Sequence, residues 1–437
     1  MNKKTTIGIS SLCLLAMAAG AAQAQSTLEY QLESGVAHSN NIDRDPDDGL
    51  DETAIIVGGG LNFTNETRRT DFGVISSLEH RIFTKDSNDD ETLLSLTGNF
   101  DFDIVERILS WRTTDTFGQV LQDPLAPSNP LNREDVNVFS TGPVLNIPLN
   151  STNRIQVAAT YRDVSFEESP QNNDALSGQI SYQRQINANR RFAVNLTSQA
   201  LDFDRAIDPD FDRNAATVSF NSQTSRSNLS IELGYNEVSF GSNLEDSDGS
   251  LVRINWNRDL TNRLSMNVSL NQELSDTGQL FDQFANERNV NSIGENFGEA
   301  DADADAIEQG RASFGLASDQ RNGRVFVTAN LLDIDFRNSN DRDRKAITLV
   351  AGATREFAGG WDVVVNASIN SSEFADGRDD DNLQIRFGVS KRLTRTLSLN
   401  ASVAHVERDS TAGNFSYDED TARLTLLWQP QRTRGGT

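Results

Sequence analysis

Residues 264–271 read LSMNVSLN, with an apolar residue at every second position and serine or asparagine between them. A period of two places the apolar side chains on one face of a β-strand and the polar ones on the other. The same alternation recurs at 192–197 (FAVNLT) and 383–390 (LQIRFGVS), and it continues from Thr27 to Trp428 without a switch to a helical period. The sequence therefore predicts an all-β protein.

The length of the alternating runs separates two kinds of all-β fold. Strands of soluble sandwiches are usually about five or six residues long, whereas tilted strands of roughly 9–11 residues cross the hydrocarbon of a bilayer. The runs in this chain are of the longer kind, and closing them into a barrel satisfies the backbone groups that lipid cannot. After residue 24 no apolar stretch is long enough for a membrane-spanning helix. We therefore expect a transmembrane antiparallel up-and-down β-barrel.

The connections between the runs alternate between two types, as in outer-membrane barrels. Tight, mostly basic turns are expected at 65–69, 106–107, 151–154, 187–191, 225–228, 261–263, 320–324, 358–360 and 394–395. Longer and strongly acidic loops are expected at 40–52, 85–91, 202–212, 241–248, 275–308, 338–343, 375–381 and 408–420, with a proline-bearing loop at 121–134. Ten hairpins give about twenty strands, within a range of 18–22, and an even number puts both ends in the periplasm beside the short turns. The long loops are then extracellular.

The first 24 residues have the plan of a secretory signal peptide. Lys3 and Lys4 precede an apolar run from Ile7 to about Ala22, and small residues flank the cleavage position after Ala24. We expect residues 25–429 to form the barrel and 430–437 a short polar tail. A lipoprotein is disfavoured, because Leu12 stands before Cys13 where a small residue is needed.

The charge balance excludes one class of partner and raises another. The chain has 64 Asp and Glu against 39 Lys and Arg, so nucleic acid is not an expected partner. Acidic clusters at 43–51, 208–212, 301–305 and 379–381 suggest weak binding of divalent cations beside lipopolysaccharide. The alternative is a set of solvated loops. We expect no other cofactor and no thiolate metal site, because Cys13 leaves with the signal peptide.

No enzymatic motif accompanies the three histidines, His38, His80 and His405. His80 and His405 are in phase with outward-facing residues, and the chain has neither Gly-x-Ser-x-Gly nor His-Glu-x-x-His. The sequence therefore favours a function other than catalysis.

The polar face predicts a hydrated lumen lined by amides, hydroxyls and scattered arginines. Our candidates for pore-lining residues are Arg112, Arg162, Arg253, Arg386, Asn255 and Asn366. The loop at 275–308 holds Phe281 and is the candidate obstruction, since it is long enough to fold into the pore; a disordered external loop is the equal alternative. Three strands change phase near their loop ends, as where Tyr161 is followed by Val164 and Phe166, and we interpret these places as bulges or local irregularities.

Several stretches carry a family resemblance. Residues 35–41 (GVAHSNN), 182–196 (YQRQINANRRFAVNL) and 387–399 (FGVSKRLTRTLSL) resemble the second class of outer-membrane β-barrel porins and the barrels encoded beside capsule or exopolysaccharide systems. The resemblance covers nearly all of the mature chain and rests on composition and repetition. It implies an outer-membrane pore, in some members tied to surface polysaccharide, and it supplies no catalytic residue.

We therefore expect an outer-membrane channel for passive passage of polar solutes, including oligo- or exopolysaccharide, inserted by the barrel insertion machinery. The alternative is a structural or surface-interaction barrel whose acidic loops bind divalent ions, lipopolysaccharide or matrix polymer. A secreted β-solenoid would show a shorter repeat than the hairpin period found here.

Overall fold

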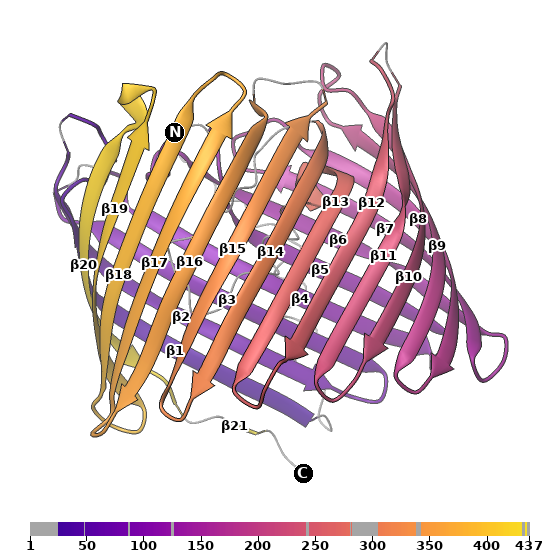
Figure 1. Cartoon of the computed structure of the whole chain (residues 1–437), viewed down its shortest axis with the longest axis horizontal. Helices are drawn as coiled ribbons and strands as arrows, with labels where there is room; N and C mark the ends of the chain where they lie inside the picture. Colours follow the sequence, from indigo (N-terminus) through magenta and orange to yellow (C-terminus); the bar gives the residue numbers. More distant parts are fainter. Residues whose placement is uncertain are drawn as a thin grey trace.

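The computed structural model describes residues 25–47, 49–85, 88–123, 126–241, 244–279, 281, 305–337, 342–430 and 433–434. The predicted signal peptide lies outside this range. Within it, twenty antiparallel strands form one closed barrel, as predicted (Figure 1). They are β1 (Gln25–Ser39), β2 (Glu52–Glu66), β3 (Thr70–Phe83), β4 (Glu91–Val105), β5 (Leu109–Leu121), β6 (Arg133–Pro148), β7 (Asn153–Phe166), β8 (Asn173–Asn187), β9 (Arg190–Phe203), β10 (Phe211–Gln223), β11 (Ser227–Phe240), β12 (Ser247–Asp259), β13 (Leu264–Asp276), β14 (Ala306–Gln320), β15 (Gly323–Phe336), β16 (Arg344–Phe357), β17 (Trp361–Phe374), β18 (Asp379–Arg392), β19 (Leu397–Ser410) and β20 (Tyr417–Trp428).

Each strand pairs with its neighbours in sequence, and β1 closes the barrel by pairing with β20 from Leu32–Trp428 to Ser39–Thr421. A two-residue strand, β21 (Thr433–Arg434), also pairs with Thr27 and Leu28 of β1. A 3-10 turn, η3 (Gly413–Phe415), stands before β20. No helix in the described ranges is long and apolar enough to cross a membrane.

The two kinds of connection gather at opposite ends of the barrel, which we call the turn end and the loop end (Figure 1). The turn end carries the nine tight turns and the start of β1. In the turn between β16 and β17, Gly359 and Gly360 both have positive φ, 80° and 75°, which glycine adopts without the steric cost of a side chain. The loop end carries the longer connections, so the predicted alternation of turns and loops is confirmed.

Strand register assigns every side chain to the inner or the outer face. Paired residues share a face, and the outer face carries apolar side chains on all twenty strands. Many of these are exposed, among them Leu32, Ile55, Leu78, Phe102, Trp111, Leu176, Leu196, Val218, Leu233, Phe314, Val327, Leu349, Ile369, Ile385, Val403 and Leu426. An apolar belt open to the outside all the way round is what a barrel presents to lipid.

The predicted bulges at the loop ends of β7, β11 and β15 are wrong. The register runs without a shift through Tyr161, Val164 and Phe166, and likewise along β11 and β15. The strands stay regular and the environment of their two faces changes instead. At the loop end the outer face becomes polar, as at Asp163, while Val164 and Phe166 are buried on the inner face.

Strand length explains this exchange. A strand of 14 residues tilted by about 40° rises roughly 35 Å, more than the ~25 Å of a barrel's apolar band. The part of each strand that rises beyond the belt has water outside, and its apolar side chains point inward. They form two buried clusters: Val120, Val136, Val138, Val164, Phe166, Phe281, Ile307, Leu332, Ile334, Phe336 and Ala346 in one, and Ala175, Leu201, Phe203, Phe211, Val238, Phe240, Leu274 and Ala306 in the other.

Candidate functional site: the closure of the lumen at the loop end

The six residues that the sequence proposed as pore-lining all lie on the inner face. Arg112 lies towards the turn end, where its Nε is 2.8 Å from Asp101 Oδ1. Asn255 is paired with Ser230 and Ser269, and Asn366 with Arg386, in the walls of the lumen. Arg162 lies nearer the loop end, and Arg253 and Arg386 lie at the middle of their strands.

The end of β13 leaves the barrel wall and enters the lumen. Its pairing with β12 stops at Gln272, whereas its pairing with β14 continues to Asp276. From Glu273 to Thr277 every side chain is buried. The Leu274 side chain lies on the lumen side of β12. Its Cγ is 3.9 Å from where a Cβ on Gly249 would stand. We call residues 273–279 and 281 the inlet segment.

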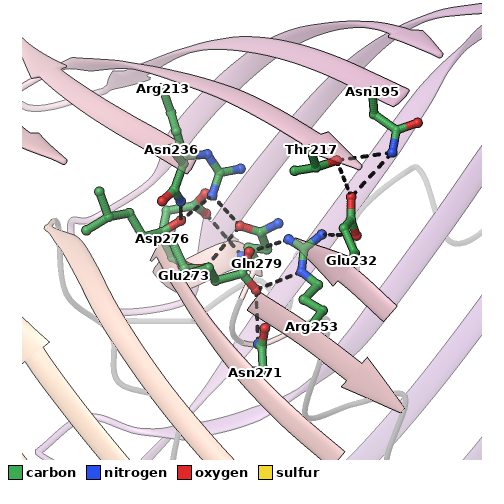
Figure 2. Close-up of polar contacts among 12 residues, drawn as sticks. Asn195, Arg213, Thr217, Glu232, Asn236, Arg253, Asn271, Glu273, Asp276 and Gln279 are labelled. Carbon is green, nitrogen blue, oxygen red and sulfur yellow. Dashed lines mark hydrogen bonds and ion pairs between the residues drawn. The ribbon is translucent and has the colours of Figure 1, made fainter. Parts of the chain in front are cut away.

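Arg253 of β12 joins the start of the inlet segment to the wall (Figure 2). Its guanidinium forms an ion pair with Glu232 on β11, at 3.1 Å, and another with Glu273. Asn271 also donates to Glu273, at 3.0 Å. Glu273 is 1% exposed, so these donors stabilise a carboxylate that has no access to water. The network continues along the wall through Thr217, which donates to Glu232.

Arg213 of β10 and Asn236 of β11 contact the main chain of the inlet segment at Leu274 (Figure 2). Both side chains donate to the carbonyl oxygen of Leu274, each at 3.1 Å. Arg213 also donates to the side chains of Gln279 and Gln199, at 2.5 Å in each case. A carbonyl that has left its strand ladder is thereby satisfied by the wall of the barrel.

Arg162 of β7 fixes the turn that follows. Its Nη2 lies 2.6 Å from Asp276 Oδ1, and both side chains are almost fully buried. The same carboxylate oxygen accepts the backbone N–H of Gln279 at 3.0 Å and so starts a helical turn at Thr277–Gln279. A Cβ on Gly278 would stand 2.6 Å from Val164 Cγ2, so the close contact with β7 depends on glycine.

Apolar packing completes the inlet. Phe281 is 1% exposed and belongs to the cluster that contains Val164 and Phe166 of β7 on one side of the barrel and Leu332 and Ile334 of β15 on the other. The cluster therefore bridges the lumen between walls that are far apart in the strand order. Of the predicted obstruction, residues 275–278, 281 and 305–307 are buried, Gln279 and Glu308 are half-buried, and residues 280 and 282–304 lie outside the described residues.

A second closure is formed by the connections β1–β2 and β5–β6. Arg44, which has a positive φ of 55°, donates to the Ser128 carbonyl at 2.9 Å and pairs with Glu419 on β20. Asn129 donates in return to the Asp43 carbonyl. At the rim, Lys85 lies 2.6 Å from Asp51, and its hydrogen bond lowers the pKa of that carboxyl. The β1–β2 and β5–β6 connections therefore contact each other at the loop end.

The acidic clusters take different roles where the structure describes them. Asp380 is buried between Arg378 and Arg408, and Asp43 accepts a hydrogen bond from Asn88. Among the described residues, no group of three or more acidic, histidine or cysteine side chains is arranged to hold a metal ion. Weak divalent binding at the remaining acidic positions stays a prediction.

Sequence reasoning missed the residues that fix the inlet, namely Arg213, Glu232, Glu273, Asp276 and Gln279. The inward phase of Arg213 and Glu232 was readable from their strands. Their partners were not, because Glu273 continues the alternation of β13, and the breaks in that alternation at Gln272 and Asp276 do not show that the strand leaves the wall.

Comparison with known proteins finds no matching family model and no matching curated protein. Among solved structures, the chain is similar to the copper transporter OprC, with 10% identity and a TM-score of 0.47 over 93% of this chain and 80% of the other. It is also similar to the FrpB iron transporter from Neisseria meningitidis, with 9% identity and a TM-score of 0.46 over 95% and 83%. An anion-selective porin from Comamonas acidovorans matches with 11% identity and a TM-score of 0.38 over 93% and 100%. Likenesses at this level say nothing of what this chain transports.

Proposed function

We propose that this chain is an outer-membrane channel for the passive passage of polar solutes, narrowed at its loop end by the inlet segment. The observation that carries the proposal is the division of the wall into an outer apolar belt and an inner polar face below the loop end. Such a belt has no counterpart in a soluble barrel, which would bury it. The loop end then faces lipopolysaccharide and the turn end the periplasm.

The inner face favours neutral or weakly charged hydroxyl-bearing solutes, such as sugars and oligosaccharides. Gln156, Gln179, Asn195, Asn370 and Gln384 lie on inner-face positions of their strands. Amides both donate and accept hydrogen bonds, so they exchange readily with the hydroxyl groups of a passing sugar. The same proposal extends to longer sugar polymers, with the lumen serving for the export of exopolysaccharide.

Single-channel conductance in a planar bilayer tests the channel, using purified protein that shows the heat-modifiable mobility of a folded barrel. Discrete steps are expected from the wild-type chain, and larger steps from a variant in which residues 277–304 are replaced by a short Gly-Ser linker. Silence in both proteins, together with liposomes no more permeable to sugars than empty vesicles, would contradict the proposal.

A second function has one observation in its favour. The buried cluster around Phe281 fills part of the lumen, as in a barrel that serves as a surface scaffold. In that case the acidic loops would bind divalent ions, lipopolysaccharide or matrix polymer. Calcium or polysaccharide binding by intact cells that disappears when the acidic loops are deleted, with conductance unchanged, would favour this scaffold over the channel.

A further inference from the structure

A cavity of about 130 Å³ lies on the inner face at the loop end, away from the inlet segment. Its walls are mainly inward-facing residues of β1–β3 and β18–β20 together with Arg133 of β6, and its roof is formed by Ile42, Arg44, Ser128 and Pro130 of the two connecting loops. A site for one ordered water needs about 10–15 Å³ by the same kind of measure. The cavity therefore has room for a small charged group and several waters.

Arginines dominate its lining. Five guanidinium groups from separate parts of the chain converge there, against two carboxylates, in a chain whose formal net charge is −25. The arginines are Arg44, Arg81, Arg133, Arg386 and Arg423, and the carboxylates are Glu52 and Glu419. Three further carboxylates, Glu33, Glu79 and Glu91, contact these arginines from outside the lining, so the excess of arginine is confined to the surface of the cavity.

Carboxylates behind the lining hold these arginines in place. Glu79, which is 1% exposed, lies 2.7 Å from Arg81 Nε and 2.9 Å from Arg423 Nη2. Glu91 lies 2.6 Å from Arg133 Nη1. Neither carboxylate lines the cavity, so each fixes the orientation of a guanidinium without filling the space in front of it.

The two lining carboxylates are already engaged. One oxygen of Glu52 accepts the backbone N–H groups of Thr53 and Lys85, and Glu419 accepts from Ser39 and Arg44. Hydroxyl and amide groups of Ser402, Thr421 and Gln384 complete the wall. Preorganised guanidinium groups bind oxyanions strongly, and hydroxyls and amides suit the sugar ring that carries one.

We propose that this cavity is a binding subsite for a single oxyanion carried by a sugar, the carboxylate of a sugar acid or the phosphate of a sugar phosphate. The inference deepens the proposed function and rests on it, because the subsite lies on the solute's route only if the barrel is a channel. It assigns to Arg386 the role of contacting the anion, since Arg386 stands on the barrel wall between Asn366 and Ala404.

Isothermal titration of the folded full-length mature protein in detergent micelles tests the subsite. The titrants are galacturonate, glucose 6-phosphate and neutral galactose, at low ionic strength. Saturable binding of galacturonate, of glucose 6-phosphate or of both is expected, with no binding of galactose, and the arm that binds identifies the source of the oxyanion. No binding of either anion, or equal binding of galactose, would overturn the proposal.

Three variants locate the binding. Arg386→Gln is expected to weaken it at least about tenfold, and Arg386→Lys to weaken it less because the charge is kept while the planar fork is lost. Arg154→Gln is the matched control, since Arg154 is an inner-face arginine at the turn end and outside the cavity, and the affinity of this variant should equal that of the wild type. Unchanged affinity in both Arg386 variants would overturn the assignment, and heat-modifiable mobility confirms that each variant is folded.

Conductance of the same preparations separates this inference from the proposed function. Conducting channels that bind neither anion would contradict only the subsite. Protein that binds the anion and never conducts would contradict only the channel.

Discussion

At the scale of single residues, the inlet depends on contacts that leave no room for substitution. Gly278 lies against Val164, whose β-branched side chain has little χ1 freedom with which to move away. Forcing extra atoms into a packed site costs about 1–3 kcal/mol.

Gly278→Val is therefore expected to displace the inlet segment and to increase single-channel conductance several-fold. Gly241→Ala is the control, because a Cβ there would meet no atom within 4 Å. Equal conductance in the two variants and the wild type would show that the inlet does not narrow the channel.

The buried pair between Arg162 and Asp276 predicts strong energetic coupling. Removing one partner of such a pair leaves an uncompensated buried charge and costs about 3–5 kcal/mol. We expect Arg162→Gln and Asp276→Asn each to lower the free energy of unfolding by an amount of this order, and the double variant to lose clearly less than the sum. Urea unfolding of all four proteins in one detergent measures the cycle, and additive losses would mean that the two groups do not interact.

At the scale of elements, the decisive feature is the place where β13 leaves β12. The Leu274 side chain lies next to Gly249 on the lumen side of β12. The pair Gly249→Cys and Leu274→Cys is therefore expected to form a disulfide. The mature protein has no other cysteine once the predicted signal peptide is removed. Gel mobility with and without reductant detects the bond.

The pair Gly241→Cys and Leu274→Cys is the control, since Gly241 has open space around it. Cross-linking of the control pair with equal yield would contradict the described path of β13.

The strands and turns were predictable from the sequence, and the path of this hairpin was not. Alternation with a period of two fixes which residues of LSMNVSLN share a face, and the tight turns fix how consecutive strands pair. The same local signal cannot tell the inner from the outer face where a strand rises out of the lipid into water. There the apolar side chains turn inward, and the change of phase at Val164 and Phe166 therefore suggested a bulge. The anchoring role of Arg213 depends on Gln279, 66 positions later in the chain, and no local pattern encodes such a contact.

At the scale of the whole molecule, the outer belt predicts how the barrel responds to charge. Val327 and Thr328 are neighbours on β15 that face opposite sides of the wall. An arginine on the lipid face near the bilayer midplane costs about 2–4 kcal/mol, whereas one on the lumen side has access to water.

Val327→Arg is thus expected to lower the free energy of unfolding in lipid vesicles by that amount, and Thr328→Arg to leave it nearly unchanged. Equal effects of the two substitutions would argue against the assignment of the faces. If Thr328→Arg alone reduced stability, the face that we assign to the lumen would be the one in contact with lipid.

Along β7, β11 and β15 the apolar side chains face outward near the turn end and inward near the loop end. The molecule therefore has two hydrophobic regions stacked along its axis. One exists only when hydrocarbon chains surround the wall, while the other is supplied entirely by the protein, as in a globular protein dissolved in water. Extraction from the bilayer removes the first and leaves the second. The loop-end half can therefore keep its shape where no membrane is present, and the half near the turns alone depends on lipid for its cohesion.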